Sequence, residues 1–245
     1  MGLLTFIRGI QISYLFRSSV VRFFKGANCK VASSARISNS KIVVSSGADL
    51  QIGENVVIRN AELYVEKGSL IIADFSIISS NDKNRRVAII INDGRVEIDN
   101  HSKISCDKIW VRFGGALSIG SYTNLNRGSE IRCDERIKIG SYNQISYNVR
   151  IWDTNTHNIL KPEQRREIAR RYYPYFGYEK TRPKTKPVEI GDDCWIGENA
   201  AILKGTTIGN GGIVGFNTTL TGVQIPPNHV AVQDISIKTI ELKHI

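Results

Sequence analysis

Aliphatic residues recur at every sixth position between residues 190 and 222. The aliphatic positions are Ile190, Ile196, Ile202, Ile208, Val214 and Leu220. The fifth place of each hexad holds a small residue: Cys194, Ala200, Thr206, Gly212 or Thr218. A period of six fits neither an α-helix, in which position i+6 lies at roughly 600°, nor an ordinary strand, which alternates every two residues. The pattern predicts short flat faces joined by turns, which bury their aliphatic side chains only when the units stack.

This pattern resembles that of the hexapeptide-repeat acyltransferases, whose coils form a left-handed parallel β-helix. In that family three hexads make one coil, so about 18 residues climb one rung of about 4.8 Å. The resemblance predicts an all-β left-handed parallel β-helix over residues 29–235 and a C-terminal tail over residues 236–245. The left hand is implied by the resemblance alone, because ordinary parallel crossovers are right-handed.

The spacing of the coils predicts two excursions. Isoleucines that open a turn lie at Ile52, Ile72, Ile98, Ile119, Ile139, Ile190 and Ile208, with gaps of 20, 26, 21, 20, 51 and 18 residues. The gap of 26 predicts a modest loop within residues 80–95, and the gap of 51 predicts a large loop over residues 158–187. The large loop carries nine Lys or Arg, three Glu and five Tyr or Phe between residues 161 and 186. Two interpretations stay open: a solvated surface loop, or a segment that helps to form the acceptor pocket.

The first residues do not follow the hexad pattern. Residues 1–26 mix many apolar side chains with Arg8, Arg17, Arg22 and Lys25. We expect a basic, helical N-terminal segment over residues 1–28. It either packs against the end of the barrel or trimer, or lies on an anionic membrane surface.

Charge and cysteine usage narrow the class of protein. The net charge of +10, from 33 Lys and Arg against 23 Asp and Glu, favours acidic partners, although no nucleic-acid-binding motif accompanies it. Cys29, Cys106, Cys133 and Cys194 show no CxxC pair and no metal spacing, which predicts free thiols in a reducing cytoplasm and no metal. No stretch reaches the roughly 18 uncharged apolar residues of a membrane span, and no signal-peptide cleavage site follows the N-terminal segment. We therefore expect a cytoplasmic protein, with contact to the inner face of the plasma membrane left open.

Two segments narrow the expected activity. Residues 151–159, IWDTNTHNI, resemble the DTD-x-H segment that carries the catalytic histidine of sugar O-acetyltransferases, and residues 186–209, KPVEIGDDCWIGENAAILKGTTIG, are similar to the run that follows it. The resemblance implies a homotrimer that transfers acetyl from acetyl-CoA to a sugar hydroxyl of a surface polysaccharide, a glycolipid or a precursor. It implies that His157 is the general base and that Asp153 orients it. Asn155 stands where the pattern has its second Asp, and we expect it to contact the acceptor.

The chemistry requires a base because a sugar hydroxyl is too weak an acid to ionise at neutral pH. Neutral imidazole, with a reference pKa of about 6.5, is suited to accept that proton and typically contributes 10²- to 10⁴-fold. The motif around His157 favours it over His101, which lies at the turn of a coil. Attack by the hydroxyl on the thioester would then be direct, since no other side chain is placed as a nucleophile.

The same resemblance implies further binding residues. Asn126 and Asp134, one coil earlier, are expected to contact the acceptor sugar. Acetyl-CoA is expected in a groove between neighbouring subunits, held by Trp195, Gly197, Glu198, Phe216 and Lys204. In this arrangement Trp195 flanks the pantetheine arm, the amides near Glu198 and Phe216 meet the donor, and Lys204 meets its phosphates.

Two other functions stay open from the sequence. An N-acyltransferase acting on an amino sugar nucleotide would use the same histidine to deprotonate an amine. A non-catalytic β-helical scaffold would use the basic loop and the N-terminal segment for binding. Comparing hydroxyl-only acceptors with amino sugars distinguishes the two transferases, and loss of turnover in His157→Ala distinguishes both from a scaffold.

Overall fold

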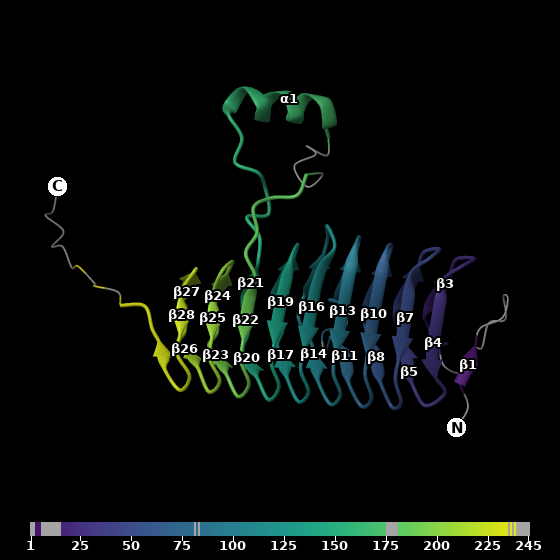
Figure 1. Ribbon diagram of the computed structural model, residues 1–245. Helices are drawn as coiled ribbons and strands as arrows, with labels where there is room; N and C mark the ends of the chain where they lie inside the picture. Colours follow the sequence, from purple (N-terminus) through teal and green to yellow (C-terminus); the bar gives the residue numbers. More distant parts are fainter. Residues whose placement is uncertain are drawn as a thin grey trace, which may run out of the picture.

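The chain winds into a three-sided prism of stacked coils (Figure 1). The computed structural model describes residues 3–5, 16–80, 82, 84–174, 181–234, 236 and 238. Each coil gives one short strand to each of three sheets, and successive strands of a sheet pair in parallel. The exception is β1 (Leu3–Thr5), which pairs with β4 in the antiparallel direction. The sheets contain ten, ten and nine strands over these residues, which makes about ten coils. The parallel β-helix expected from the hexads is confirmed.

Sheet 1 contains β1 (Leu3–Thr5), β4 (Asn28–Ala32), β7 (Asp49–Ile52), β10 (Gly68–Ile72), β13 (Gly94–Ile98), β16 (Gly115–Ile119), β19 (Arg136–Ile139), β22 (Val188–Ile190), β25 (Thr207–Ile208) and β28 (Gln224–Ile225). Sheet 2 contains β2 (Phe16–Arg17), β5 (Arg36–Ser38), β8 (Val57–Arg59), β11 (Ile77–Ser79), β14 (Lys103–Ile104), β17 (Asn124–Leu125), β20 (Gln144–Ile145), β23 (Trp195–Ile196), β26 (Ile213–Val214) and β29 (Val230–Ala231). Sheet 3 contains β3 (Val20–Phe23), β6 (Lys41–Val44), β9 (Ala61–Val65), β12 (Val87–Ile91), β15 (Lys108–Val111), β18 (Glu130–Cys133), β21 (Arg150–Trp152), β24 (Ala201–Leu203) and β27 (Thr219–Thr221). We name the edges of the prism by the sheets that meet there: the 1–2 edge, the 2–3 edge and the 3–1 edge.

The core is a set of aliphatic columns inside the prism. Ile98, Ile119, Ile139, Ile190 and Ile208 pair directly from coil to coil in sheet 1, and each is at most 2% exposed. Successive residues of a strand point to opposite faces, so one residue in two enters the core. The small residues of the fifth hexad place are buried beside the turns, where a larger side chain would not fit. The sequence period of six is therefore the length of one face and its turn.

Four aromatic rings form a ladder along the 1–2 edge. Phe75, His101, Tyr122 and Tyr142 stack with ring-centroid distances of 5.0, 4.7 and 5.1 Å. Each has a positive φ between 56° and 59°, a conformation that side chains other than Asn, Asp and Gly rarely adopt. Ring stacking between coils offsets part of that cost. His101 therefore stacks between Phe75 and Tyr122 in this ladder.

The expected N-terminal helix is wrong where the structure describes the segment. Residues 3–5, 16–17 and 20–23 are strands, and β3 pairs in parallel with β6. Val20, Val21 and Phe23 suit a pleated, half-buried surface, and Val21 and Phe23 pack against the core. The remaining residues of that segment, 1–2 and 6–15, lie outside the described residues.

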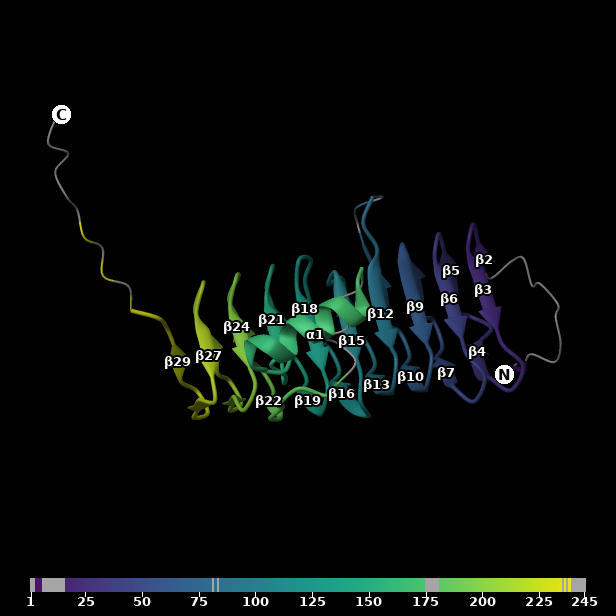
Figure 2. The same ribbon diagram turned by 90° about the horizontal axis from the view of Figure 1, so that it is seen from above.

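The smaller excursion is confirmed, since β11 ends at Ser79 and β12 begins at Val87. Of its expected tip, Asn81 and Lys83 lie outside the described residues. The larger excursion leaves the 3–1 edge between β21 and β22 and carries helix α1 (Pro162–Tyr172), the single helix of the described chain. Figures 1 and 2 show α1 standing off the prism and running roughly along the direction in which the coils stack.

Candidate functional site

The large excursion rises from the prism as a paired ribbon. The amide of Lys186 donates to the carbonyl of Asp153 at 2.9 Å, and that of Asn155 donates to Lys184 at 3.0 Å. Thr154 and Thr185 form an antiparallel bridge between these two bonds. We call the ribbon and α1 together the arm. It begins at residue 153, five residues before the expected boundary of 158, because the backbone pairs with itself as soon as it leaves the sheet.

His157 lies on the outgoing strand of the ribbon and is exposed. Just before it, Thr156 has a φ of +64°, and its amide donates to the Thr154 side-chain oxygen at 3.0 Å. A positive φ is costly for a β-branched residue, and such strain collects at functional sites. Just after it, the Asn158 side chain donates to the Thr181 hydroxyl at 2.8 Å across the ribbon. The backbone on both sides of the imidazole is thus held by short polar contacts.

Asp153 closes the base of the arm. Its side chain is fully buried, and its two oxygens accept three backbone N–H groups, from Asp134, Glu135 and Arg136, each at 2.8 Å. Burial raises the pKa of Asp153 despite these three donors, which act in the opposite direction. These bonds tie the arm to the turn one coil below, and the predicted orienting role of Asp153 toward His157 stays a prediction.

Asp134 lies in a buried ion pair. It is fully buried, and its carboxylate faces the guanidinium of Arg112 in a two-point ion pair at 2.8 and 2.7 Å. The guanidinium also lies 4.3 Å from the ring centroid of Trp110 and 5.0 Å from that of Phe113. Both carboxylate oxygens are engaged inside the 3–1 edge by a partner one coil away, which no local sequence pattern indicates. The predicted contact of Asp134 with the acceptor stays a prediction.

The donor residues expected from the sequence gather on a different edge. Trp195, in β23 of sheet 2, is 56% exposed, and Phe216, at the 2–3 edge one coil further, is 68% exposed. Glu198 lies at the 2–3 edge in the same coil as Trp195. Tyr147, one coil below Glu198 and 45% exposed, belongs to the same surface. No sequence motif includes Tyr147, but its position in the turn of the preceding coil could have identified it.

Two backbone amides on this edge are available as donors. Among the described residues, neither the amide of Glu198 nor that of Phe216 donates to a backbone or side-chain acceptor. The predicted role of Gly197 toward the donor stays a prediction. A Cβ at Gly197 would lie 2.8 Å from the backbone of residues 214–216. Its small size allows the coils to stack.

The structure divides the predicted residues between two edges. His157, Asp153 and Asn155 belong to the arm at the 3–1 edge, and Lys204 lies on that edge in the turn after β24. Gly197, Glu198 and Phe216 lie at the 2–3 edge, and Trp195 lies on the neighbouring sheet 2 in β23. Asn126 lies on the 2–3 edge too, and its side-chain amide donates to the carbonyl of Ile145 at 3.0 Å. A single chain therefore does not bring the base and the donor residues together.

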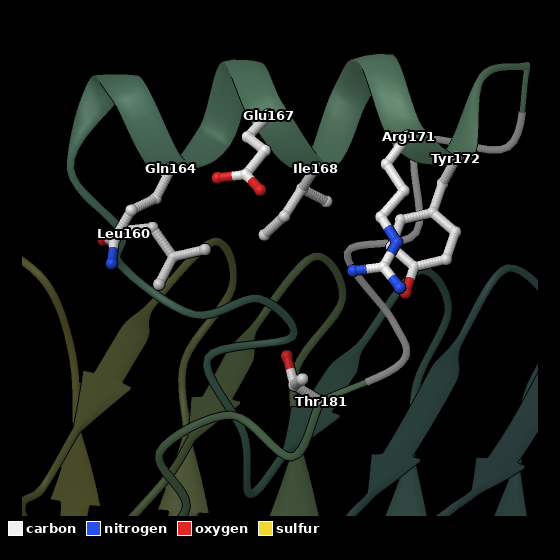
Figure 3. A pocket seen from close by; sticks show the side chains of 7 residues that line it. All are labelled: Leu160, Gln164, Glu167, Ile168, Arg171, Tyr172 and Thr181. Atoms are coloured by element: carbon white, nitrogen blue, oxygen red, sulfur yellow. The ribbon is translucent and has the colours of Figure 1, made fainter.

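The arm carries a cavity of its own. Its volume is about 280 Å³. Figure 3 shows side chains of α1 pointing from the helix toward the ribbon and the prism. The lining combines apolar, polar and charged groups: Leu160, Gln164, Glu167, Ile168, Arg171, Tyr172 and Thr181. A mixed lining of this kind suits a ligand with both hydroxyls and apolar faces.

Comparison with known proteins agrees with this architecture. Residues 187–222 match the profile "Bacterial transferase hexapeptide (six repeats)". Over 142 residues the chain is 30% identical to the Escherichia coli K12 protein "Putative lipopolysaccharide biosynthesis O-acetyl transferase WbbJ", a match that covers 58% of this chain and 69% of that protein. The chain belongs to the hexapeptide-repeat transferase family.

Two further matches show how far the likeness extends. A Staphylococcus aureus Mu50 protein named "Putative acetyltransferase" is 39% identical over 61 residues, which is 25% of this hexapeptide-repeat chain and only 28% of the relative. The crystal structure of the polySia specific acetyltransferase NeuO superposes with a TM-score of 0.55 at 21% identity, covering 94% of this chain and 92% of that one. The match to NeuO shows a common fold. The relatives from Escherichia coli and Mycobacterium tuberculosis are also named as acetyltransferases.

The same hexapeptide-repeat chain shows no cluster of three or more metal-ligating His, Cys, Asp or Glu in its described part. Nor does any helix in those residues have the length and apolar character needed to cross a membrane. The four cysteines are free and buried, and burial raises the pKa of each thiol, to about 11 for Cys29.

Proposed function

We propose that this protein transfers an acetyl group from acetyl-CoA to a sugar hydroxyl of a surface polysaccharide, a glycolipid or a precursor. The observation that carries the proposal is membership of the hexapeptide-repeat family, shown by a relative named as an O-acetyl transferase of lipopolysaccharide biosynthesis. The exposed position of His157 on the ribbon, next to the strained backbone of Thr156, supports it as the site of the chemistry.

His157 serves as the general base. Its neutral imidazole takes the proton of the acceptor hydroxyl while the oxygen attacks the thioester carbonyl of the donor. The new C–O ester bond forms as the C–S bond breaks, and the proton passes to the departing thiolate. The free amides of Glu198 and Phe216 are suited to the donor side, one coil apart, as hydrogen-bond donors to its carbonyl oxygens.

Transfer is direct, because the chain offers no accessible thiol for an acyl-enzyme. Cys194, the cysteine of the hexad run, is 1% exposed and points into the core. Burial also raises the pKa of its thiol, which keeps it protonated and poorly nucleophilic.

The complete site forms between two copies of the chain. His157 and Lys204 come from the 3–1 edge of one copy. Glu198 and Phe216 at the 2–3 edge, and Trp195 on sheet 2, come from its neighbour. The separation of these groups within one chain supports this arrangement, and a homotrimer satisfies it with three equal contacts. Lys204 would then meet the donor phosphates from the same side as the base.

The test measures transfer and subunit sharing together. Purified protein is given acetyl-CoA with hydroxyl-only sugars and with amino sugars, and the product linkage is read by mass spectrometry. Ester products support the proposal, whereas amide products alone would replace it with N-acyl transfer.

The second experiment tests whether the site is shared between copies. His157→Ala and Trp195→Ala chains are co-expressed. Activity regained in the mixed assembly shows a site shared between copies, and two inactive parents with an inactive mixture contradict it.

A further inference from the structure

Unpaired positive charge is concentrated on the arm. Its described residues hold eight Lys or Arg against two Glu, and all eight cations are exposed: Lys161, Arg165, Arg166, Arg170, Arg171, Arg182, Lys184 and Lys186. Within the described chain none of the eight forms a salt bridge. Like charges held this close repel one another, which favours a polyanionic ligand.

Several cations of the coils are paired with carboxylates. Arg112 is paired with Asp134, Arg132 with Glu130 at 2.9 Å, and Lys67 with Asp93 at 3.3 Å. The excursion over residues 80–86 is also neutralised, since Arg85 lies 3.6 Å from Asp107. Other coil cations, such as Lys30 and Arg95, also form no salt bridge within the described chain, but they are spread along the prism, whereas the arm gathers eight such cations within residues 161–186.

Helix α1 lacks the packing that normally stabilises a helix of its length. It has 11 residues and no buried side chain. Isolated helices shorter than about 12–15 residues are marginal in water, so a ligand on this helix would add to its stability. The cavity on its lower side places Ile168 and Tyr172 beside Gln164, Arg171 and Thr181 (Figure 3). This combination matches a sugar ring, which has apolar C–H faces and a rim of hydroxyls.

We propose that the arm binds a polysaccharide whose sugar units carry carboxylates, and that this acidic chain is the acetyl acceptor. The second half of the statement rests on the proposed function. One sugar unit occupies the cavity, and its carboxylate and those of neighbouring units pair with the arginines of α1 and with Arg182 and Lys184. These two cations lie on the returning strand of the ribbon, and His157 lies on the outgoing strand. A chain held by the arm is thereby brought to the base.

An acidic polysaccharide explains the arm better than a lipid surface does. A helix that lies on a membrane needs a broad apolar face, and α1 offers only Ile168, Ala169 and Tyr172 among its charged and polar side chains. The eight cations also extend along the ribbon as well as the helix, so they follow a path rather than a plane.

Direct binding provides the first test. The probe is a fluorescent oligogalacturonate, and its carboxyl-reduced form is a neutral chain of the same length. We expect wild-type protein to bind the acidic chain at least tenfold more tightly, with affinity falling as salt rises. The quadruple variant Arg165→Gln, Arg166→Gln, Arg170→Gln and Arg171→Gln should bind it about tenfold or more weakly. The control Lys30→Gln with Arg95→Gln removes exposed cations from sheet 1 and should bind like wild type.

Kinetics provide the second test. In the quadruple variant, KM for the acidic acceptor should rise about tenfold, with KM for acetyl-CoA unchanged. Equal binding of the acidic and neutral chains, or an unaffected quadruple variant, would overturn the proposal. The proposal would also be overturned if the quadruple variant changed KM for acetyl-CoA, because the arm would then bind the donor phosphates. It would be overturned likewise if the variant lost binding only to vesicles of anionic lipid. If the acidic chain binds as expected but no acetyl is transferred to any acceptor, the binding site stands and the proposed transferase activity fails.

Discussion

The 3–1 edge contains two kinds of connection: short turns between coils, and the arm. At the 3–1 edge, β15 and β16 are joined by residues 112–114, and β18 and β19 by residues 134–135. Between β21 and β22 the edge opens into residues 153–187. The short turns bury their polar groups in bonds to the next coil, whereas α1 buries no side chain. Stability therefore resides in the coils, and the groups proposed for chemistry and acceptor binding lie on the part that contributes least to it.

The sharpest test of this division is His157→Ala. We expect kcat for acetyl transfer to fall about 10²- to 10⁴-fold, because the hydroxyl loses its base. The urea midpoint should not change, since the side chain is exposed. His101→Asn is a matched control that also removes an imidazole but keeps a residue that tolerates a positive φ. An active His157→Ala enzyme would place the base elsewhere.

The buried ion pair should show the opposite behaviour. Arg112→Met leaves the Asp134 carboxylate buried without its partner, and we expect the free energy of unfolding to fall by about 3–5 kcal/mol. The double variant Arg112→Met with Asp134→Leu should recover much of that loss, because no charge is left uncompensated. Urea denaturation of both variants measures the difference. A single variant as stable as wild type would show that this pair does not hold the 3–1 edge.

Asp153 stands at the boundary between the two regions. Asp153→Asn replaces one accepting oxygen by an NH₂ group that faces backbone donors, and the expected loss is about 1–3 kcal/mol. The contribution of the wild-type carboxyl also depends on pH. Burial raises its pKa in the folded chain, so its stabilising effect is greatest below the ordinary value of 3.8 and decreases as pH rises through the raised pKa. Urea midpoints of both proteins measured from pH 3 upward give the difference, and a gap that instead widens steadily with pH would contradict this sign.

The smallest effect is expected on the helix. Ile168→Ala should change the free energy of unfolding by less than about 0.5 kcal/mol, because no residue of α1 is buried. The same substitution at Ile151, which is fully buried in β21, should cost about 2–5 kcal/mol. Equal losses at the two positions would mean that the arm packs as part of the fold.

The sequence was informative wherever one hexad determines its own environment. Ile190, Ile196 and Ile202 each enter the core at the predicted place, since the inward position is set by a repeat that can be read locally. The contacts that hold the site are not local. Asp153 binds amides 17 to 19 residues away, and Arg112 meets Asp134 22 residues away, so both depend on how one coil lies over the next. The N-terminal strands were missed for a related reason, because β3 is selected by its pairing with β6.

The paired base of the ribbon allows the β-helix and the arm to evolve independently. Since the backbone is clasped from Asp153 to Lys186 before it rejoins the stack, the insert can be exchanged between homologous chains at those two residues without altering how the layers lie on each other. If the arm binds the acceptor as we propose, transplanting it should carry acceptor preference to the new host, while the residues proposed to bind the acyl donor stay those of the recipient.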